Sequence, residues 1–287
     1  MLPSKFMSAA PQFATAGYGM AATFAWGTSD FLGGYATKQA NAFLFTAIFN
    51  FGGLLFVGTL AEASGAAFLS ERSMLWVLAG GVLGSAGVAI FFRALSMGRM
   101  GLVAPVAAVL GAAIPAIFSM YTEGVPGKIP LLGFIFAAIG LWLITRAEGG
   151  STPEGLGFAV VAGMGFAGFY TCIRQAGTGS PFWFATLTRT GGLVVTGLIV
   201  VLQRKLREIT RSGVRLAFIA GCIDSCGTML FVLASQSGRL DEAVVISSLY
   251  PAVTVLLARL VLKEHFTRWR FVGLLAALAA VPMIAAY

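Results

Sequence analysis

The sequence alternates between long apolar runs and short segments that are rich in glycine, proline or charged residues. About 20 predominantly apolar residues are needed for a helix to cross the hydrocarbon core of a bilayer, and several runs reach that length. Because short loops join antiparallel neighbours, helices that follow one another are expected to pack side by side. The pattern predicts ten spans: Phe13–Ala36, Phe43–Leu60, Leu75–Met97, Leu102–Tyr121, Ile129–Thr145, Gly155–Ile173, Pro181–Leu202, Val214–Ser237, Ala243–Leu262 and Phe271–Ala286.

A second pattern recurs at a fixed offset of 140 residues. Gly98-Arg99-Met100 matches Gly238-Arg239-Leu240, and Gly133 matches Gly273. In the third and eighth spans the matched pairs are Gly81 and Gly221, Ser85 and Ser225, Gly87 and Gly227, Phe91 and Phe231, and Ala94 and Ala234. Each half then holds five spans, and an odd number inserts the second half from the opposite side of the membrane. We therefore predict an all-α polytopic membrane protein of two inverted five-helix repeats, residues 1–147 and 148–287, around a central cavity, as in alternating-access transporters.

The ninth predicted span contains Pro251, which follows Tyr250. Proline cannot donate a backbone hydrogen bond, so it frees the carbonyl group one turn earlier, near Ser247. Such a break is tolerated in a membrane only where it is buried in protein or lines a cavity. The segment 250–251 is therefore a candidate for the wall of a binding cavity.

The composition agrees with a membrane protein, because 58% of the residues are hydrophobic and only 10% are charged. Soluble domains carry roughly 25% charged residues. The net charge of +8 comes from basic residues that lie mostly in the short loops. This placement is typical of a topology signal facing the cytoplasm, and we expect no nucleic-acid partner.

The basic loop residues divide unevenly between the two sides of the predicted bundle. Eleven lie on one side: Lys38, Arg99, Arg146, Arg204, Lys205, Arg207, Arg211, Arg215, Lys263, Arg268 and Arg270. Five lie on the other: Lys5, Arg72, Lys128, Arg174 and Arg239. The positive-inside rule places the first side in the cytoplasm. We predict a multi-pass protein of the cell (inner) membrane with both termini outside.

Four charged residues inside predicted spans stand out: Asp30, Arg93, Arg189 and Asp224. Charged residues inside a membrane are costly, and they usually face other protein groups or a water-filled cavity. One interpretation makes an aspartate a proton or cation site and an arginine the partner of a substrate carboxylate. The other makes them internal ion pairs, such as an aspartate with Arg189. Arg93, near the end of its span, is expected to extend towards the cytoplasmic interface.

Three segments resemble the EamA-type members of the drug/metabolite transporter superfamily. They are Trp26 to Gly34 (WGTSDFLGG), Phe92 to Val106 (FRALSMGRMGLVAPV) and Leu249 to Ala258 (LYPAVTVLLA). The resemblance covers essentially the whole chain, and it implies ten helices in two inverted repeats around a central cavity. Relatives move small metabolites, often amino acids, outward. Many relatives keep both termini inside, whereas the charge pattern of this chain predicts the reverse.

The resemblance also places several aromatic side chains on spans near the cavity. Together with the charged residues and the Tyr250-Pro251 break, they give a predicted substrate site. Its members are Trp26, Asp30, Phe92, Tyr170, Arg189, Asp224, Tyr250 and Pro251.

We predict a secondary transporter that moves small organic metabolites, amino acids or related compounds, by alternating access, with efflux as the direction. Multidrug or cation efflux, and facilitated uniport or uptake of a small metabolite, are the alternatives. A membrane-embedded enzyme is a remote alternative, because no nucleophile–base pair and no histidine within a span is found. A structural subunit is equally remote, because of the inverted duplication. We expect no cofactor, no metal site and no ATP-binding loop, with protons as a candidate coupling ion and the lipid bilayer as the surroundings. The oligomeric state is left open.

Overall fold

A computed structural model describes residues 4–98, 100–123, 128–145, 154–204, 209–237, 243, 246–247, 249–264 and 267–285. Its regular structure is entirely helical within these residues: α1 (Ser4–Ala36), α2 (Ala42–Ala63), α3 (Glu71–Met97), α4 (Met100–Glu123), α5 (Lys128–Thr145), α6 (Leu156–Ala176), α7 (Pro181–Gln203), α8 (Arg211–Ser237), α10 (Tyr250–Val261) and α11 (Arg268–Ala285). The prediction of an all-α protein is confirmed. Every predicted span overlaps one of these helices, although α1 begins earlier than predicted and α10 later.

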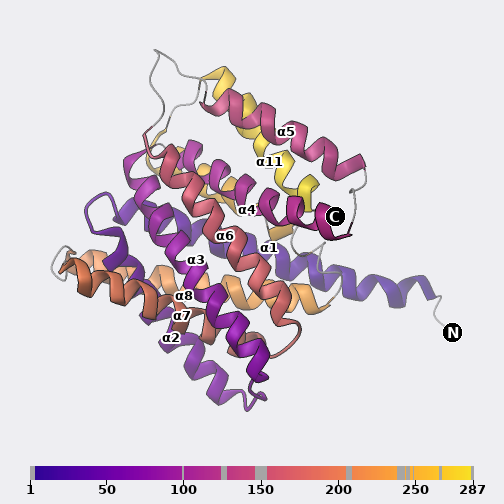
Figure 1. Cartoon of the computed structure of the whole chain (residues 1–287), viewed down its shortest axis with the longest axis vertical. Helices are drawn as coiled ribbons and strands as arrows, with labels where there is room; N and C mark the ends of the chain where they lie inside the picture. Colours follow the sequence, from indigo (N-terminus) through magenta and orange to yellow (C-terminus); the bar gives the residue numbers. More distant parts are fainter. Residues whose placement is uncertain are drawn as a thin grey trace.

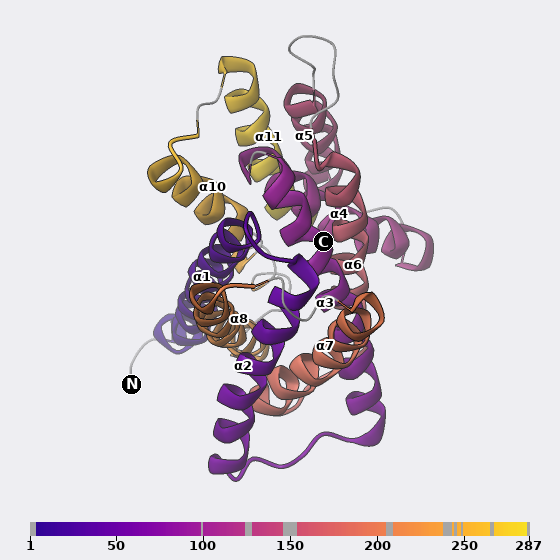
Figure 2. The ribbon, with the colours of Figure 1, turned by 90° about the vertical axis from the view of Figure 1, so that its left-hand side faces the viewer.

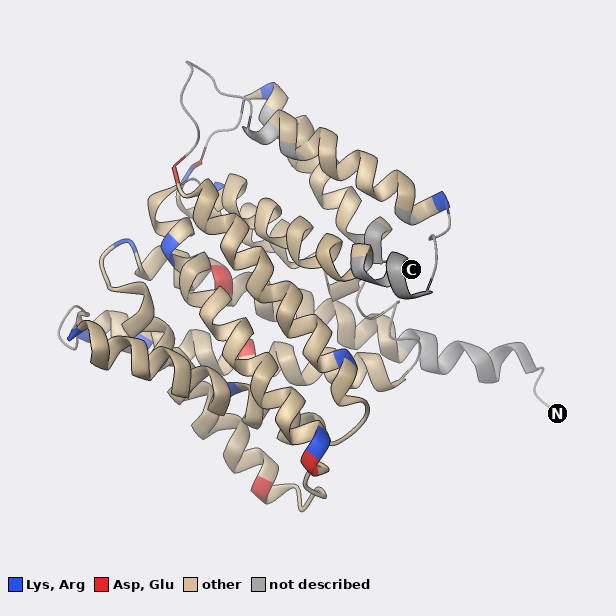
Figure 3. Ribbon diagram, viewed as in Figure 1, with Lys and Arg blue, Asp and Glu red and all other residues tan. Residues whose placement is uncertain are grey.

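Within the described part of the chain, five helices are long and apolar enough to cross a membrane by length and composition: α2, α3, α6, α7 and α8. They hold between 21 and 27 residues, which at 1.5 Å per residue gives about 32–40 Å. Charged residues gather near helix ends and in connections, and few lie in the middle of the bundle (Figure 3). These features are those of a multi-pass membrane protein.

Several helix starts follow directly from local sequence. The Asn41 Oδ1 atom accepts hydrogen bonds from the backbone N–H groups of Phe43 and Leu44, at 3.0 and 3.1 Å, and so caps α2. Ser180 caps α7, where Pro181 takes a position in the first turn. Proline suits that position because the missing N–H would have no helical partner there.

The break predicted at Pro251 is a helix start. Pro251 lies in the first turn of α10, which has 12 residues and is about 18 Å long. The helix is therefore too short to cross a hydrocarbon core of about 30 Å by itself. Thr23 of α1 donates a hydrogen bond to the carbonyl oxygen of Ile246 at 2.8 Å. A hydroxyl group of α1 thus satisfies a carbonyl group just before the new helix.

The helices pack in related pairs (Figures 1 and 2). α8 packs against α1 and α2, while α3 packs against α6 and α7; α10 packs against α1, while α4 packs against α6. α2 also packs against α7, and α5 against α11, as one pair set apart from the centre of the bundle. The offset of 140 residues matches α1 with α6, α2 with α7, α3 with α8, α4 with α10 and α5 with α11. If matched helices are exchanged, each of these pairings becomes another of them or stays the same.

The helix bounds follow the same relation. α3 and α8 begin at 71 and 211 and end at 97 and 237, and α5 and α11 begin at 128 and 268 and end at 145 and 285. Each bound differs from its mate by 140. α2 and α7 begin at 42 and 181, a difference of 139, so the offset slips by one residue at the start of this pair.

Glycines allow two equivalent helix crossings. A Cβ atom on Gly221 of α8 would collide with the backbone of Phe49 in α2, and a Cβ atom on Gly81 of α3 would collide with the backbone of Thr188 in α7. Small residues allow such close backbone approach in membrane helices. The backbone of α2 therefore packs directly against Gly221 of α8, and the backbone of α7 packs directly against Gly81 of α3.

This packing predicts that Gly221→Ala and Gly81→Ala each lower the free energy of unfolding by about 1–3 kcal/mol, the usual cost of overpacking. The matched control is Gly197→Ala in α7, where a Cβ atom would meet nothing within 4 Å. Unfolding of the purified chain in mixed detergent micelles measures the difference. Equal stability of the three variants would contradict the proposed role of the two glycines.

Candidate functional site

A cavity lies between helices of both halves of the chain. It contains about 570 Å³ of space free of protein atoms, counting the part open to solvent. α1, α3, α6, α7, α8 and α10 supply its walls. The lining residues are Trp26, Asp30, Gly84, Ser85, Val88, Phe166, Phe169, Tyr170, Thr188, Arg189, Asp224, Thr228 and Tyr250.

Six of the eight residues predicted as a substrate site line this cavity: Trp26, Asp30, Tyr170, Arg189, Asp224 and Tyr250. They come from α1, α6, α7, α8 and α10, so the fold gathers residues that are far apart in the sequence. Their shared location makes the cavity the candidate site.

Arg189 is the centre of a buried polar network. Its Nη2 atom donates to Asp224 Oδ2 in an ion pair, and also to Thr228 Oγ1 at 3.2 Å. Its Nη1 atom donates to Asn50 Oδ1 at 3.3 Å. The guanidinium group also lies over the ring of Phe49, 5.2 Å from the ring centre. The network contains an internal ion pair between Arg189 and an aspartate, which was one of the two interpretations of the sequence.

Asp30 stands apart from that network. Asp30 is only 6% exposed, yet its carboxylate makes no hydrogen bond or ion pair with any residue that the structure describes. It lies within electrostatic range of Asp224, Tyr170 and Tyr250. The position of α1 is set by hydrogen bonds on either side of Asp30, from Ser29 Oγ to the Ala220 carbonyl at 3.0 Å and from Thr254 Oγ1 to the Gly27 carbonyl at 3.1 Å.

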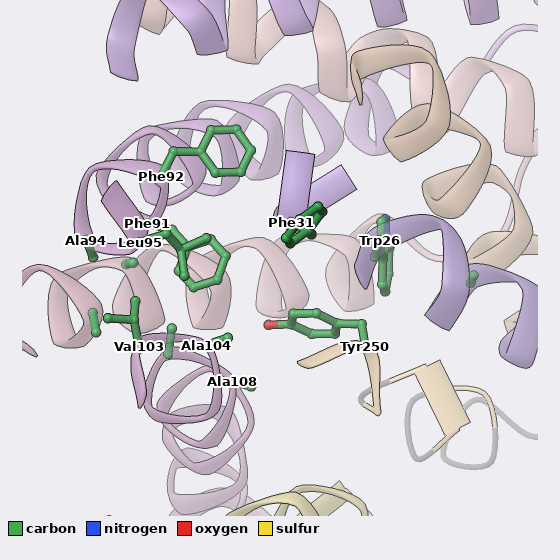
Figure 4. Close-up of a cluster of buried hydrophobic side chains, with 14 of the residues drawn as sticks. Trp26, Phe31, Phe91, Phe92, Ala94, Leu95, Val103, Ala104, Ala108 and Tyr250 are labelled. Carbon is green, nitrogen blue, oxygen red and sulfur yellow. The ribbon is translucent and has the colours of Figure 1, made fainter. Parts of the chain in front are cut away.

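Aromatic rings form a continuous series beside the two carboxylates. Trp26 lies 5.4 Å from Phe231 and 6.1 Å from Tyr250 between ring centres, and Tyr170 lies 6.2 Å from Phe231 and 5.4 Å from Phe169. Figure 4 shows Trp26 next to Tyr250. Four of these five rings line the cavity. Phe231 does not line it and packs against Trp26 and Tyr170.

Phe92 and Pro251, the other two predicted residues, do not line the cavity. Phe92 is fully buried and packs edge-on against Phe45 and Phe49, at 5.6 and 5.7 Å. Figure 4 shows it with Phe91 in the apolar cluster, away from Tyr250. Pro251 is also buried, and its place in the chain orients Tyr250 at the start of α10. Arg93 is exposed, as expected for a side chain that extends towards an interface.

Sequence analysis missed Asn50 and gave no role to Thr188. Asn50 is fully buried, and its Oδ1 atom accepts hydrogen bonds from both Arg189 and Ser85, the latter at 3.2 Å. An asparagine within the apolar run of α2 is the signal that could have identified it, because a polar side chain inside a span needs a partner. Only the fold shows that Thr188 lines the cavity. Its sequence position gave no signal, since threonine occurs in many spans.

No group of three or more metal-ligating side chains occurs among the described residues. Cys172, Cys222 and Cys226 are free thiols on α6 and α8. The Cys222 thiol contacts the Gly52 carbonyl oxygen at 3.7 Å, which is a packing contact between α8 and α2. His265 lies outside the described residues.

The network predicts strong coupling between Arg189 and Asp224. Removing one partner of a buried ion pair leaves an uncompensated charge and typically costs about 3–5 kcal/mol. We expect Asp224→Asn and Arg189→Gln each to lower the free energy of unfolding by about this amount, and the double variant to lower it by much less than their sum. Unfolding in mixed micelles measures all three, and additive effects would contradict the prediction.

Comparison with known proteins agrees with this architecture. A crystal structure of another protein superposes with a TM-score of 0.66 at 19% sequence identity over 94% of each chain. At this identity the likeness shows the fold alone. The search of curated proteins found no significant match. The model of the EamA-like transporter family matches residues 153–286, nearly the whole second half of this chain, which agrees with the resemblance predicted from the sequence.

Proposed function

We propose that this chain is a secondary transporter of small organic metabolites that works by alternating access in the cell membrane. The observation that carries the proposal is the cavity lined by Asp30, Arg189 and Asp224. These buried charged groups lie between helices of both halves, where a membrane protein tolerates charge for substrate or ion handling.

The helix pairings support two inverted repeats of five helices, residues 1–147 and 148–287. Most contacts between the halves have a counterpart after exchange of the halves, and most helix bounds shift by the same 140 residues. Inverted repeats give a transporter two conformations of similar packing, one open to each side. All ten described helices then belong to the membrane domain.

Efflux of amino acids or related compounds is the proposed activity, with protons as the coupling ion. Cation or multidrug efflux and facilitated uptake are the alternative activities of the same cavity. An enzymatic function finds less support, because the polar groups of the cavity form an ion-pair network instead of a nucleophile with an adjacent base.

A counterflow assay tests transport directly. Proteoliposomes that contain the chain and an unlabelled amino acid or amine should transiently accumulate the same compound, radiolabelled, from outside. We expect Asp224→Asn to lower the initial rate, because Arg189 then loses its charge partner next to the cavity. The exposed Glu62 provides a control, and Glu62→Gln should transport at the unaltered rate. Counterflow no greater than in protein-free liposomes, across a panel of amino acids and amines, would refute the function.

The proposed orientation places both termini outside and the α7–α8 connection in the cytoplasm. Two exposed positions form a matched pair, Ser212 at the start of α8 and Thr178 between α6 and α7. We expect a membrane-impermeant maleimide to label Thr178→Cys on intact cells, and to label Ser212→Cys only after permeabilisation. The reverse pattern would invert the topology and return the termini to the cytoplasm.

A further inference from the structure

The charged side chains that line the cavity do not balance. They are Asp30, Asp224 and Arg189, and Arg189 is paired with Asp224. With both carboxylates ionised, one negative charge remains, on Asp30. A buried carboxylate without a counter-charge is strongly unfavourable, so the cavity is electrically complete only when a cation or a proton joins Asp30.

The positive charge of Arg189 is already paired with Asp224 in this arrangement. Its Nη1 and Nη2 atoms bond Asn50, Thr228 and Asp224. Its Nε atom is buried and has no partner among the described residues. No other lysine or arginine among the described residues lines the cavity. A carboxylate ligand would therefore meet Asp30 and Asp224 without a free cationic group to hold it.

The aromatic walls favour the same sign of charge. A cation over the face of tryptophan or tyrosine gains about 0.5–2 kcal/mol, most where water is excluded. Trp26 and Tyr250 meet edge to face, with ring planes at 85°, so they present two differently oriented surfaces beside the cavity. Tyr170 and Phe169 add an edge-to-face pair at 61° from α6.

The charges also break the symmetry of the repeat. At the 140-residue offset the mate of Asp30 is Tyr170, and the mate of Asp224 is Gly84; all four residues line the cavity. The packing that the two halves share therefore does not require either carboxylate. The charge of Asp224 is paired with Arg189, whereas Asp30 has no protein partner among the described residues.

We infer that the cavity binds a small monovalent organic cation, a protonated amine or a quaternary ammonium with an apolar substituent, whose charged group pairs with Asp30. The substituent packs against Trp26, Tyr170 and Tyr250. This assignment rests on the proposed transport function and narrows its substrate class from amino acids and related compounds to amines that lack a free carboxylate.

Four probes that share a phenyl group and differ in charge test the inference: phenethylamine (cation), 3-phenylpropanoate (anion), L-phenylalanine (zwitterion) and 3-phenylpropanamide (neutral). Calorimetric titration of the full chain in lipid nanodiscs at neutral pH should give the cation at least a tenfold lower Kd than the anion or the zwitterion. This comparison uses the unaltered chain, so it does not depend on the folding of any variant.

The Asp30→Asn variant then locates the charge. Hydrogen bonds to charged groups contribute about 1.5–3 kcal/mol, so phenethylamine affinity should fall by on the order of 10- to 100-fold. Affinity for the neutral amide should change little. Glu62→Gln, an exposed carboxylate outside the cavity, should leave both affinities unchanged.

Three results would overturn the inference: tighter or equal binding of the anion or the zwitterion, unchanged phenethylamine affinity in a folded Asp30→Asn variant, or binding of none of the four probes. The second result would leave Asp30 as a proton site only. Counterflow of the same probes separates this inference from the transport function. Transport of 3-phenylpropanoate would support the function and refute the cation site. Selective binding of phenethylamine, with no counterflow of any amino acid or amine in the panel, would support the cation site and refute the function.

Discussion

The ion pair between Arg189 and Asp224 is the interaction on which the centre of this structure depends. A guanidinium group placed inside an apolar bundle needs both a counter-charge and hydrogen-bond acceptors, because the desolvation of an unpaired charge exceeds what packing can offset. Asp224 of α8 supplies the charge, and Asn50 of α2 and Thr228 of α8 supply acceptors. The requirement therefore fixes α2, α7 and α8 relative to one another, which joins the two halves of the chain.

The other side of the cavity is held by hydroxyl groups that bond backbone carbonyl oxygens. On α1, Thr23 and Ser29 reach Ile246 and Ala220, and Thr254 of α10 returns to Gly27. Gly27 lets the backbone of Tyr250 approach, since a Cβ atom there would stand 2.5 Å from the Tyr250 carbonyl oxygen. These contacts hold Trp26, Asp30 and Tyr250 in place without using the Asp30 carboxylate. The residues around Asp30 therefore fix its position, while its carboxylate has no hydrogen-bond or charge partner among the described residues.

Sequence patterns predicted the helices well because apolar run length alone determines most of them. They also predicted Asp30, Arg189 and Asp224 of the cavity, since a charged residue inside a span has few other uses. The family resemblance, not the pattern, pointed to the aromatic residues of the cavity. They could not decide between an arginine that binds substrate and one that pairs internally, because that depends on how α7 and α8 face each other. Phe92 shows the same limit: its motif resembles a family segment, but the side chain lies on the packed face of α3. Pro251 shows a different one, since proline is compatible with both an interrupted helix and a new start.

The two ends of the bundle differ at one contact. Glu264, beyond the end of α10, accepts hydrogen bonds from the Met100 and Gly101 N–H groups at 3.1 and 3.2 Å. These N–H groups at the start of α4 have no helical acceptor, and a carboxylate there also interacts favourably with the helix dipole. At the 140-residue offset the mate of Glu264 is Gly124, which has no side chain with which to cap a helix. If the halves exchange conformations as proposed, opening this end breaks two charge-assisted hydrogen bonds that Gly124 cannot replace at the other end. In that case the two access states of the proposed transporter would be alike in backbone packing and unequal in polar contacts, both at this link and at Asp30 in the cavity.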